Sequence, residues 1–295
     1  MTVPRPILRV RDITDAAPRA AFDRLVHRAV AVDGAAPFND QALIDVEAGS
    51  RSLLFAIAPP ESPSAVELLV GAALIGNGEL EFVVDPEWRG TGVGSSMLSE
   101  ILANAPPKLL AWAHGDHPAS RSLAVRFGFD RVRTLLQLRM SLSPSPGTSS
   151  LPPGITAFRP GIDDVEWVEL NARVFASHPE QGRITVDDLR ARQSEPWFDA
   201  GDFLLARDES GRLLGYNWLK VDADHGEVYV LGVGEPGRGL GRALMLAGLD
   251  RLRERGVRTA SLYVEGDNEP AVRLYRSLGF TDYAVDVQYR RRDTD

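Results

Sequence analysis

Blocks of apolar and polar residues along the second half of the chain predict a short series of strands and helices. Apolar runs at residues 203–206 and 213–218 flank a turn at residues 208–211, which predicts an antiparallel hairpin. Residues 227–233 follow and predict a third strand. Leucines at helical spacing come after a glycine-rich turn and predict a helix over residues 240–255.

The two halves of the chain repeat one another. The segment from Ala111 to Phe129 matches the segment from Leu262 to Phe280 at a constant offset of 151 residues, without a gap. Each half runs from a helical stretch through β-rich segments, a glycine-rich turn, a helix, a strand and a helix to a final strand. We therefore expect an α/β (α+β) fold of two tandem domains, each with a mixed, largely antiparallel central sheet flanked by helices.

The stretch between the halves is rich in proline and serine and has no apolar periodicity. Residues 141–153 thus read as an extended linker. The expected domains are residues 1–140 and residues 154–295.

Composition narrows the possible functions. The chain has 295 residues, 44% of them hydrophobic and 25% charged, which is typical of globular domains. It contains no cysteine, which excludes disulfides, thiolate metal sites and a cysteine acyl-enzyme. The net charge of −8 argues against a nucleic-acid partner, and no apolar stretch is long enough to span a membrane. We expect a cytoplasmic monomer that binds a small molecule and no metal.

A strand, a glycine-rich turn and a helix in sequence can form an anion site. The turn from Pro236 to Gly241 would place backbone N–H groups and the helix N-terminus around a phosphate. Pro236 has no N–H, so the donors would come from Gly237 onward. Taken alone, this turn could equally be a plain connection, but the first half carries a similar turn from Gly90 to Gly94.

These features resemble the GNAT superfamily of acetyltransferases. The resemblance implies that the turn holds the pyrophosphate of acetyl-CoA, that Asn268 contacts its pantetheine arm and that Tyr275 faces its thioester sulfur. The cofactor-binding residues that it implies are Leu231, Gly232, Val233, Pro236, Gly237, Arg238, Gly239, Leu240, Gly241, Arg242, Asn268, Glu269, Pro270, Ala271, Val272 and Arg273 in the second half, and Phe82, Val83, Val84, Gly90, Thr91, Gly92, Val93, Gly94 and Ser95 in the first. Acetyl-CoA could thus bind once in each domain.

Amide formation from a thioester requires a base for the amine and an acid for the departing thiolate. We expect Glu227 to be the base and Tyr275 the acid, although a solvated glutamate and a core tyrosine would give the same pattern. Alternation along the strand puts Glu227 on the face of Tyr229 and Leu231.

The first half is predicted to lack both groups, because Gly78 aligns with Glu227 and Ala124 with Tyr275. Glu79 and Glu81 lie close enough to supply a base if the register differs, but nothing nearby replaces the tyrosine hydroxyl. We therefore expect a non-catalytic first domain.

Longer stretches resemble the mycothiol synthase family of actinobacteria. They include residues 31–37, 112–115, 177–182, 195–199, 212–221, 226–230 and 262–265. The resemblance implies acetylation of the cysteinyl amine of 1-D-myo-inositol 2-(L-cysteinylamino)-2-deoxy-α-D-glucopyranoside (desacetylmycothiol), an aminothiol glycoside. It also implies acceptor contacts from Asp40, Glu180, Lys220, Glu227 and Tyr263, with the acceptor between the domains. Two alternatives are a tandem GNAT enzyme with another primary-amine acceptor and a non-catalytic acyl-CoA sensor.

Overall fold

The computed structural model describes residues 5–59, 67–143, 151–176, 181–235 and 239–292. The chain divides into two compact units, each described below by itself. Unit 1 comprises Met1–Leu136, Glu265–Asp267 and Ala284–Asp295, and unit 2 comprises Gln137–Val264 and Asn268–Tyr283. The boundaries expected from the sequence placed all of residues 154–295 in one domain, whereas this division groups the end of the chain with the first unit.

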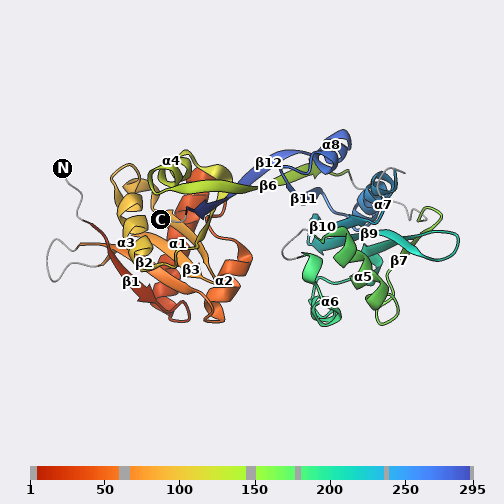
Figure 1. The fold of residues 1–295 in the computed structure, drawn as a ribbon, viewed down its shortest axis with the longest axis horizontal. Coiled ribbons are helices and arrows are strands. Elements are labelled where there is room, and N and C mark those ends of the chain that lie inside the picture. The colour runs from red at the N-terminus through yellow and green to blue at the C-terminus, as the bar shows by residue number, and fades with distance from the viewer. Residues whose placement is uncertain (1–4, 60–66, 144–150, 177–180, 236–238, 293–295) are drawn as a thin grey trace. The chain divides into compact units, whose positions relative to one another are not determined.

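Unit 1 holds the first half of the element series (Figure 1). Its elements are β1 (Ile7–Arg11), α1 (Ala16–Asp33), α2 (Asp40–Glu47), β2 (Ser52–Ala58), β3 (Leu68–Gly76), β4 (Glu79–Val84), the 3₁₀ helix η1 (Pro86–Trp88), α3 (Val93–Asn104), β5 (Leu110–Ala113), η2 (His114–Asp116) and α4 (Pro118–Arg126). Two further strands, β6 (Phe129–Ser141) and β12 (Thr281–Arg291), contribute residues to both units.

Unit 2 holds the second half of the series. Its elements are β7 (Ile155–Ala157), α5 (Asp164–Val174), η3 (Gln181–Arg183), α6 (Val186–Gln193), η4 (Ala200–Asp202), β8 (Phe203–Arg207), β9 (Leu213–Asp222), β10 (His225–Val233), α7 (Leu240–Glu254), β11 (Thr259–Glu265) and α8 (Glu269–Ser277). The predicted hairpin is confirmed by the antiparallel pairing of β8 with β9, and the third strand and the helix after the turn are present as predicted. Among the described helices none is long and apolar enough to cross a membrane.

The sheets of the two units have matching orders. In unit 1 the order is β1-β2-β3-β4-β5-β12-β6, and in unit 2 it is β7-β8-β9-β10-β11-β6. Each sheet begins with antiparallel strands and contains one parallel pair, β4 with β5 and β10 with β11. The predicted fold class, a mixed and largely antiparallel sheet with helices, is confirmed.

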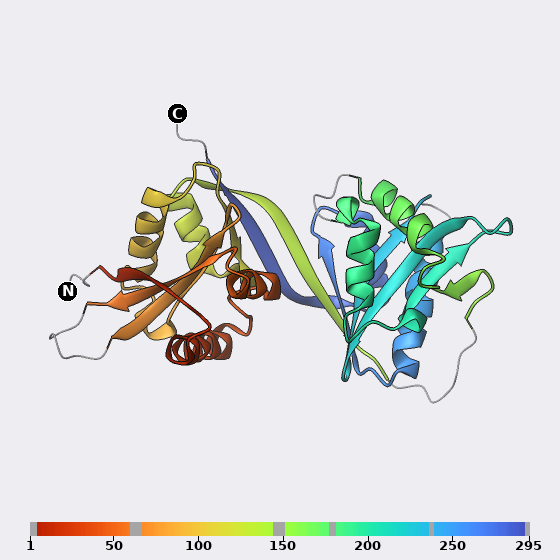
Figure 2. The ribbon, with the colours of Figure 1, turned by 90° about the horizontal axis from the view of Figure 1, so that it is seen from below.

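Helices cover both faces of each sheet (Figure 2). In unit 1, α1 and α2 pack on one face around Phe22 and Phe55, while α3 and α4 pack on the other around Met97 and Phe129. In unit 2, α5 and α6 pack on a cluster of stacked aromatic rings around Trp218, and α7 packs on the opposite face through Leu244. Two separate apolar layers per sheet fix the direction in which every strand side chain points.

The last strand of the chain completes the sheet of unit 1. The strand next to β5 is β12, with Val287 opposite Ala113 and Tyr289 opposite Ala111, rather than β6, which follows β5 in the sequence. The segment of β6 that belongs to unit 2, residues 137–141, adjoins β11 in turn. The two repeats have therefore exchanged the ends of their final strands, a feature that the local sequence pattern did not predict.

An ionic clamp fastens β12 to unit 1. The buried His114 ring contacts Glu81 through Nε2 and Asp286 through Nδ1, each at 3.2 Å, and the backbone N–H of Gly115 donates to Asp286 at 3.1 Å. Burial alone would lower the pKa of His114, but hydrogen bonds and charges from Asp286 and Glu81 outweigh it and raise the pKa to about 9. The imidazolium thus joins β4, the end of β5 and β12.

This clamp predicts that unit 1 loses stability at alkaline pH. Because the folded pKa of His114 exceeds its unfolded value, the stabilisation is fully present below pH 6.5 and is lost as the pH rises through about 9. A shift of this size corresponds to up to about 3 kcal/mol. We expect the difference in unfolding free energy between the wild type and His114→Gln, measured by urea denaturation, to shrink from pH 6 to pH 10. A difference that does not change with pH would contradict the clamp.

Candidate active site

The two parallel strands of unit 2 separate where the predicted site lies. Strand β10 pairs with β11 from His225 to Val228, but β10 continues to Val233 and β11 to Glu265 beyond the last pair, Val228 with Leu262. The main-chain groups on that edge of β10 are therefore released from the sheet. Because Leu231, Gly232 and Val233 lie on the released segment, they are placed to pair with the amides of a ligand.

Unit 1 has the same opening. Strand β4 pairs with β5 only at Glu79 and Leu80, although β4 runs on to Val84. A cavity of about 480 Å³ lies at this opening, and its lining includes the predicted residues Phe82, Val83, Val84, Gly90, Gly92, Gly94 and Ser95. The other two predicted first-domain residues, Thr91 and Val93, are not part of this lining, and the binding of acetyl-CoA in the cavity stays a prediction.

A helix begins beside each opening, with a left-handed glycine at its N-cap. Gly239 precedes α7 with φ 73°, and Gly92 precedes α3 with φ 97°. Neither cap has a side-chain partner, neither first turn carries an acidic residue, and a Cβ at either glycine would meet nothing within 4 Å. Within the described residues nothing lies close to either glycine, and the first N–H groups of a helix have no intrahelical partner, which suits an anion such as a pyrophosphate. Pro236, Gly237 and Arg238 lie outside the described residues.

The helices around each site are joined by an equivalent arginine–serine hydrogen bond. In unit 2, Arg242 on α7 donates to the hydroxyl of Ser277 on α8 at 3.0 Å. In unit 1, Arg126 on α4 donates to the hydroxyl of Ser95 on α3 at 3.1 Å. The repeats have thus kept the contact while exchanging its donor and acceptor, which supports a structural role for Arg242 and Ser95.

The predicted contact residues on α8 surround its N-terminus. Asn268 caps the helix, its side chain accepting from the N–H of Ala271 at 3.3 Å, and Pro270 lies in the first turn. Glu269 and Arg273 form an exposed ion pair at 2.9 Å. Capping uses only the oxygen of Asn268, so its amide N–H groups remain able to contact a ligand.

Tyr275 is buried on the inner face of α8. It is 7% exposed, and its ring packs edge-on against Phe280 with centroids 6.2 Å apart. No described residue makes a hydrogen bond to its hydroxyl. Desolvation raises the pKa of Tyr275 to about 12, so the phenol keeps its proton at neutral pH and can donate it.

Glu227 lies at the start of β10, directly opposite Lys220 on β9. A β-bulge between Val228 and Val230 adds one residue to β10, so that Tyr229 and Val230 both pack in the aromatic cluster of α5 and α6. Glu227 shares that face with Tyr229, as predicted. Leu231 packs instead with α7 on the other face, so the predicted common face of Glu227 and Leu231 is wrong.

The bulge also corrects the alignment of the two repeats. Glu227 pairs with Ser261 on the parallel strand, and the counterpart of Ser261, Leu110, pairs with Glu79. Glu79 rather than Gly78 is therefore the structural equivalent of Glu227, because β4 lacks the extra residue. The carboxylate of Glu79 is engaged by Arg51, by Trp112 at 3.4 Å and by Gln288 at 3.5 Å.

The other predicted acceptor residues are distributed over the chain. Tyr263 is half exposed on β11 in unit 2, while Asp40 is exposed at the start of α2 in unit 1. Glu180 lies outside the described residues. The roles of all three stay predictions.

Two aromatic residues join the sites without having been predicted to do so. Trp197 lies under the ammonium of Lys220, with Nζ 5.4 Å from the ring centroid. Its ring also packs against that of Tyr229, with the two ring centroids 5.3 Å apart. Tyr289, on β12, lines the cavity of unit 1. Trp197 stood in a motif that resembled the family but had no assigned role. Tyr289 reaches its cavity only through the strand exchange, which left no signal in the sequence.

Comparisons with known proteins agree with this architecture. The Acetyltransferase (GNAT) family model matches residues 167–280. The chain is similar to a GCN5-related N-acetyltransferase from Sphaerobacter thermophilus, with a TM-score of 0.73 and 24% identity over 100% of this chain and 99% of the other. It is also similar to a tandem GNAT protein from the clavulanic acid biosynthesis pathway, with a TM-score of 0.66 and 18% identity over 98% and 99% of the two chains. These two likenesses support the fold.

Sequence relatives are closer. A mycothiol acetyltransferase of Clavibacter sepedonicus is 50% identical over 279 residues, covering 90% of each chain. One from Thermomonospora curvata is 48% identical over 275 residues, covering 90% of this chain and 91% of the relative. With this identity over nearly its full length, and with two repeats that each carry an opened parallel strand pair beside a glycine-capped helix, the chain belongs to the mycothiol acetyltransferase family of GNAT acetyltransferases.

Proposed function

We propose that the chain transfers the acetyl group of acetyl-CoA to the cysteinyl amine of desacetylmycothiol, forming mycothiol. A relative that is 50% identical is named mycothiol acetyltransferase, and desacetylmycothiol is the acceptor that the family resemblance implies. The observation in the structure that carries the proposal is the buried phenol of Tyr275, which has no hydrogen-bond partner among the described residues and belongs to the unit that contains Glu227.

The proposed reaction needs three proton transfers. The acceptor ammonium loses a proton to Glu227, directly or through a water, and the neutral amine attacks the thioester carbonyl. As the C–S bond breaks, Tyr275 donates its proton to the departing thiolate, and the second proton of the attacking nitrogen then restores the phenol of Tyr275, so that the products are the amide and coenzyme A. The high pKa of Tyr275 suits this role because the phenol is protonated at every physiological pH.

The face that carries Glu227 suits a cationic and hydroxylated acceptor. Lys220 stands opposite Glu227 in the sheet and is held over the ring of Trp197. Arg192 donates to the hydroxyl of Tyr229 at 3.2 Å, next to the same tryptophan. A carboxylate can bind the amine of the acceptor, while the fixed ammonium can donate to its oxygens.

We further propose that each unit binds one acetyl-CoA and that only unit 2 transfers the acetyl group. In unit 1 the cavity and the helix N-terminus are present, but the carboxylate equivalent to Glu227 is engaged by Arg51. Acetyl transfer to a different primary amine remains a competing hypothesis, as does a protein that only senses acyl-CoA.

An acceptor comparison tests the proposed substrate. We expect the purified chain to convert desacetylmycothiol and acetyl-CoA to mycothiol, measured by mass spectrometry because the thiol of the acceptor would itself react with thiol reagents. An aminoglycoside, a polyamine and a peptide N-terminus serve as competitors. Faster turnover of any of these would reject the assignment, and binding of acetyl-CoA without any turnover would support the sensor.

Substitution of the two proton-transfer groups tests the mechanism. Glu227→Gln and Tyr275→Phe should each lower kcat by about 100-fold with little change in KM, since both remove acid–base catalysis. The matched controls are Glu209→Gln and Tyr283→Phe, two exposed residues of unit 2, which should keep wild-type kcat. An unchanged kcat in either site variant would remove that residue from the mechanism.

A pair of glycine substitutions tests the pyrophosphate site. Gly239→Ala and Gly256→Ala impose the same strain at opposite ends of α7, because φ is 73° and 75° and neither Cβ would meet another atom within 4 Å. Each should cost about 1 kcal/mol of stability. Only Gly239→Ala should also raise KM for acetyl-CoA, by about tenfold, the effect of losing one hydrogen bond to a charged group. Equal KM values for both variants would place the pyrophosphate elsewhere.

A further inference from the structure

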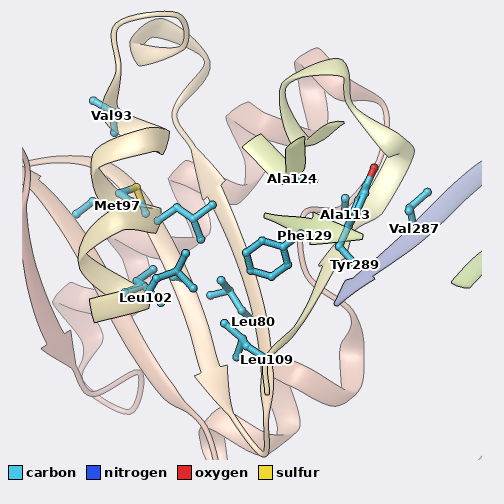
Figure 3. Packing of buried hydrophobic residues seen from close by; sticks show 14 of the residues in the cluster. Leu80, Val93, Met97, Leu102, Leu109, Ala113, Ala124, Phe129, Val287 and Tyr289 are labelled. Carbon is cyan, nitrogen blue, oxygen red and sulfur yellow. The ribbon is translucent and has the colours of Figure 1, made fainter. Parts of the chain in front are cut away.

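The cavity of unit 1 contains a phenol that the sequence did not place there. Tyr289 is 8% exposed, packs with Ala124 and Phe129 in one apolar cluster, and lines the cavity. Figure 3 shows its hydroxyl oxygen pointing away from Leu80 and Leu109, on the side of the cluster where Ala124 lies.

The hydroxyl of Tyr289 is unpartnered within the described part of the chain. No described residue makes a hydrogen bond to it, although the ring is buried. Desolvation, followed by the charge of Asp116, raises the pKa of Tyr289, so the hydroxyl keeps its proton. The hydroxyl oxygen is not among the buried polar atoms without a partner, so it is accessible and can donate to a ligand in the cavity that it lines.

The two units each have one such phenol, but on different elements. In unit 2 the phenol is Tyr275 on α8, whose counterpart on α4 is Ala124. At the same offset of 151 residues, Tyr289 corresponds to Leu138, a fully buried leucine on the exchanged segment of β6. Unit 1 thus has Ala124 and Tyr289 at these two positions, and unit 2 has Tyr275 and Leu138. Each unit has one hydroxyl at this pair of positions.

The unit 1 site also contains a carboxylate, that of Glu79. Glu79 is engaged by Arg51, which also contacts Asp45 at 3.0 Å and Glu81 at 3.4 Å. Both carboxylate oxygens of Glu79 already accept hydrogen bonds, Oε2 from Arg51 and Oε1 from Trp112 and Gln288, so neither is placed to take a proton from an incoming amine. The cavity therefore has a group that can hold a thioester but no available base to promote its aminolysis.

We propose that Tyr289 binds the thioester carbonyl of an acyl-CoA in the cavity of unit 1, where the ligand is held without being transferred. This rests on the proposed acetyl-CoA site in that unit. Because Tyr289 and Asp286 both come from β12, the ligand and the His114 clamp fasten the same strand. Filling the cavity therefore stabilises the attachment of the C-terminal strand to unit 1.

Hydrogen exchange of the full-length chain, followed by mass spectrometry, tests this role. In the wild type, acetyl-CoA should slow exchange in residues 284–292 more than coenzyme A does, since coenzyme A lacks the thioester carbonyl. Tyr289→Phe keeps the ring and should lower acetyl-CoA affinity for this site by about fivefold, the effect of one hydrogen bond. Its affinity for coenzyme A should not change. Tyr283→Phe, an exposed tyrosine, is the matched control and should behave as the wild type.

Several outcomes would overturn the proposal. If Tyr289→Phe weakens both ligands equally, the tyrosine has only a structural role. If acetyl-CoA protects only α7 and α8, the cavity of unit 1 does not bind it. Formation of mycothiol is measured separately and reports on unit 2, so a failed transfer assay with normal protection of β12 would reject the proposed reaction and not the role of Tyr289.

Discussion

The early end of pairing between two parallel strands is the constraint on which both sites depend. Main-chain N–H and C=O groups need partners when they are removed from water. The pairing of β10 with β11 ends at Val228, and that of β4 with β5 ends at Leu80. The main-chain groups on the freed edge of β10 and of β4 must therefore find other partners. A ligand with amides along an extended arm satisfies that requirement, and the adjacent helix N-terminus supplies donors for its anionic end.

The opening in unit 2 is held by packing as well as by the pairing of β10 with β9. A side chain on Gly232 would lie 2.5 Å from the ring and hydroxyl of Tyr216, whose hydroxyl donates to Asn171 at 2.7 Å. The released strand is thus fixed against a rigid aromatic layer. The bulge at Tyr229 then divides the strand, because Glu227 faces this layer while Leu231 faces α7.

Much of this could be predicted from residues alone, because repeats, turns and helix stripes are local signals. The hairpin of β8 and β9, helix α7 and the glycine turns were all found in this way. The equivalence of Glu79 and Glu227 could not be predicted, because a bulge adds a residue without a distinctive side chain. The extra residue shifts the alignment of all strand positions that precede it by one. The position of Tyr289 could not be predicted for another reason, because strand exchange depends on long-range pairing. The sequence repeat predicts that β6, the strand after β5 in the same repeat, pairs with β5, whereas β12 takes that place.

These two omissions change how the repeats are related. The sequence alignment of the two repeats suggests that unit 1 has neither the carboxylate nor the phenol of unit 2. The structure instead shows a carboxylate engaged by Arg51 and a phenol supplied by the exchanged strand. Arg51, whose side chain is 5% exposed, contacts three acidic residues, Asp45, Glu79 and Glu81. These contacts give Glu79 a structural role in unit 1, because removing one partner of a buried ion pair is more costly than removing an exposed carboxylate.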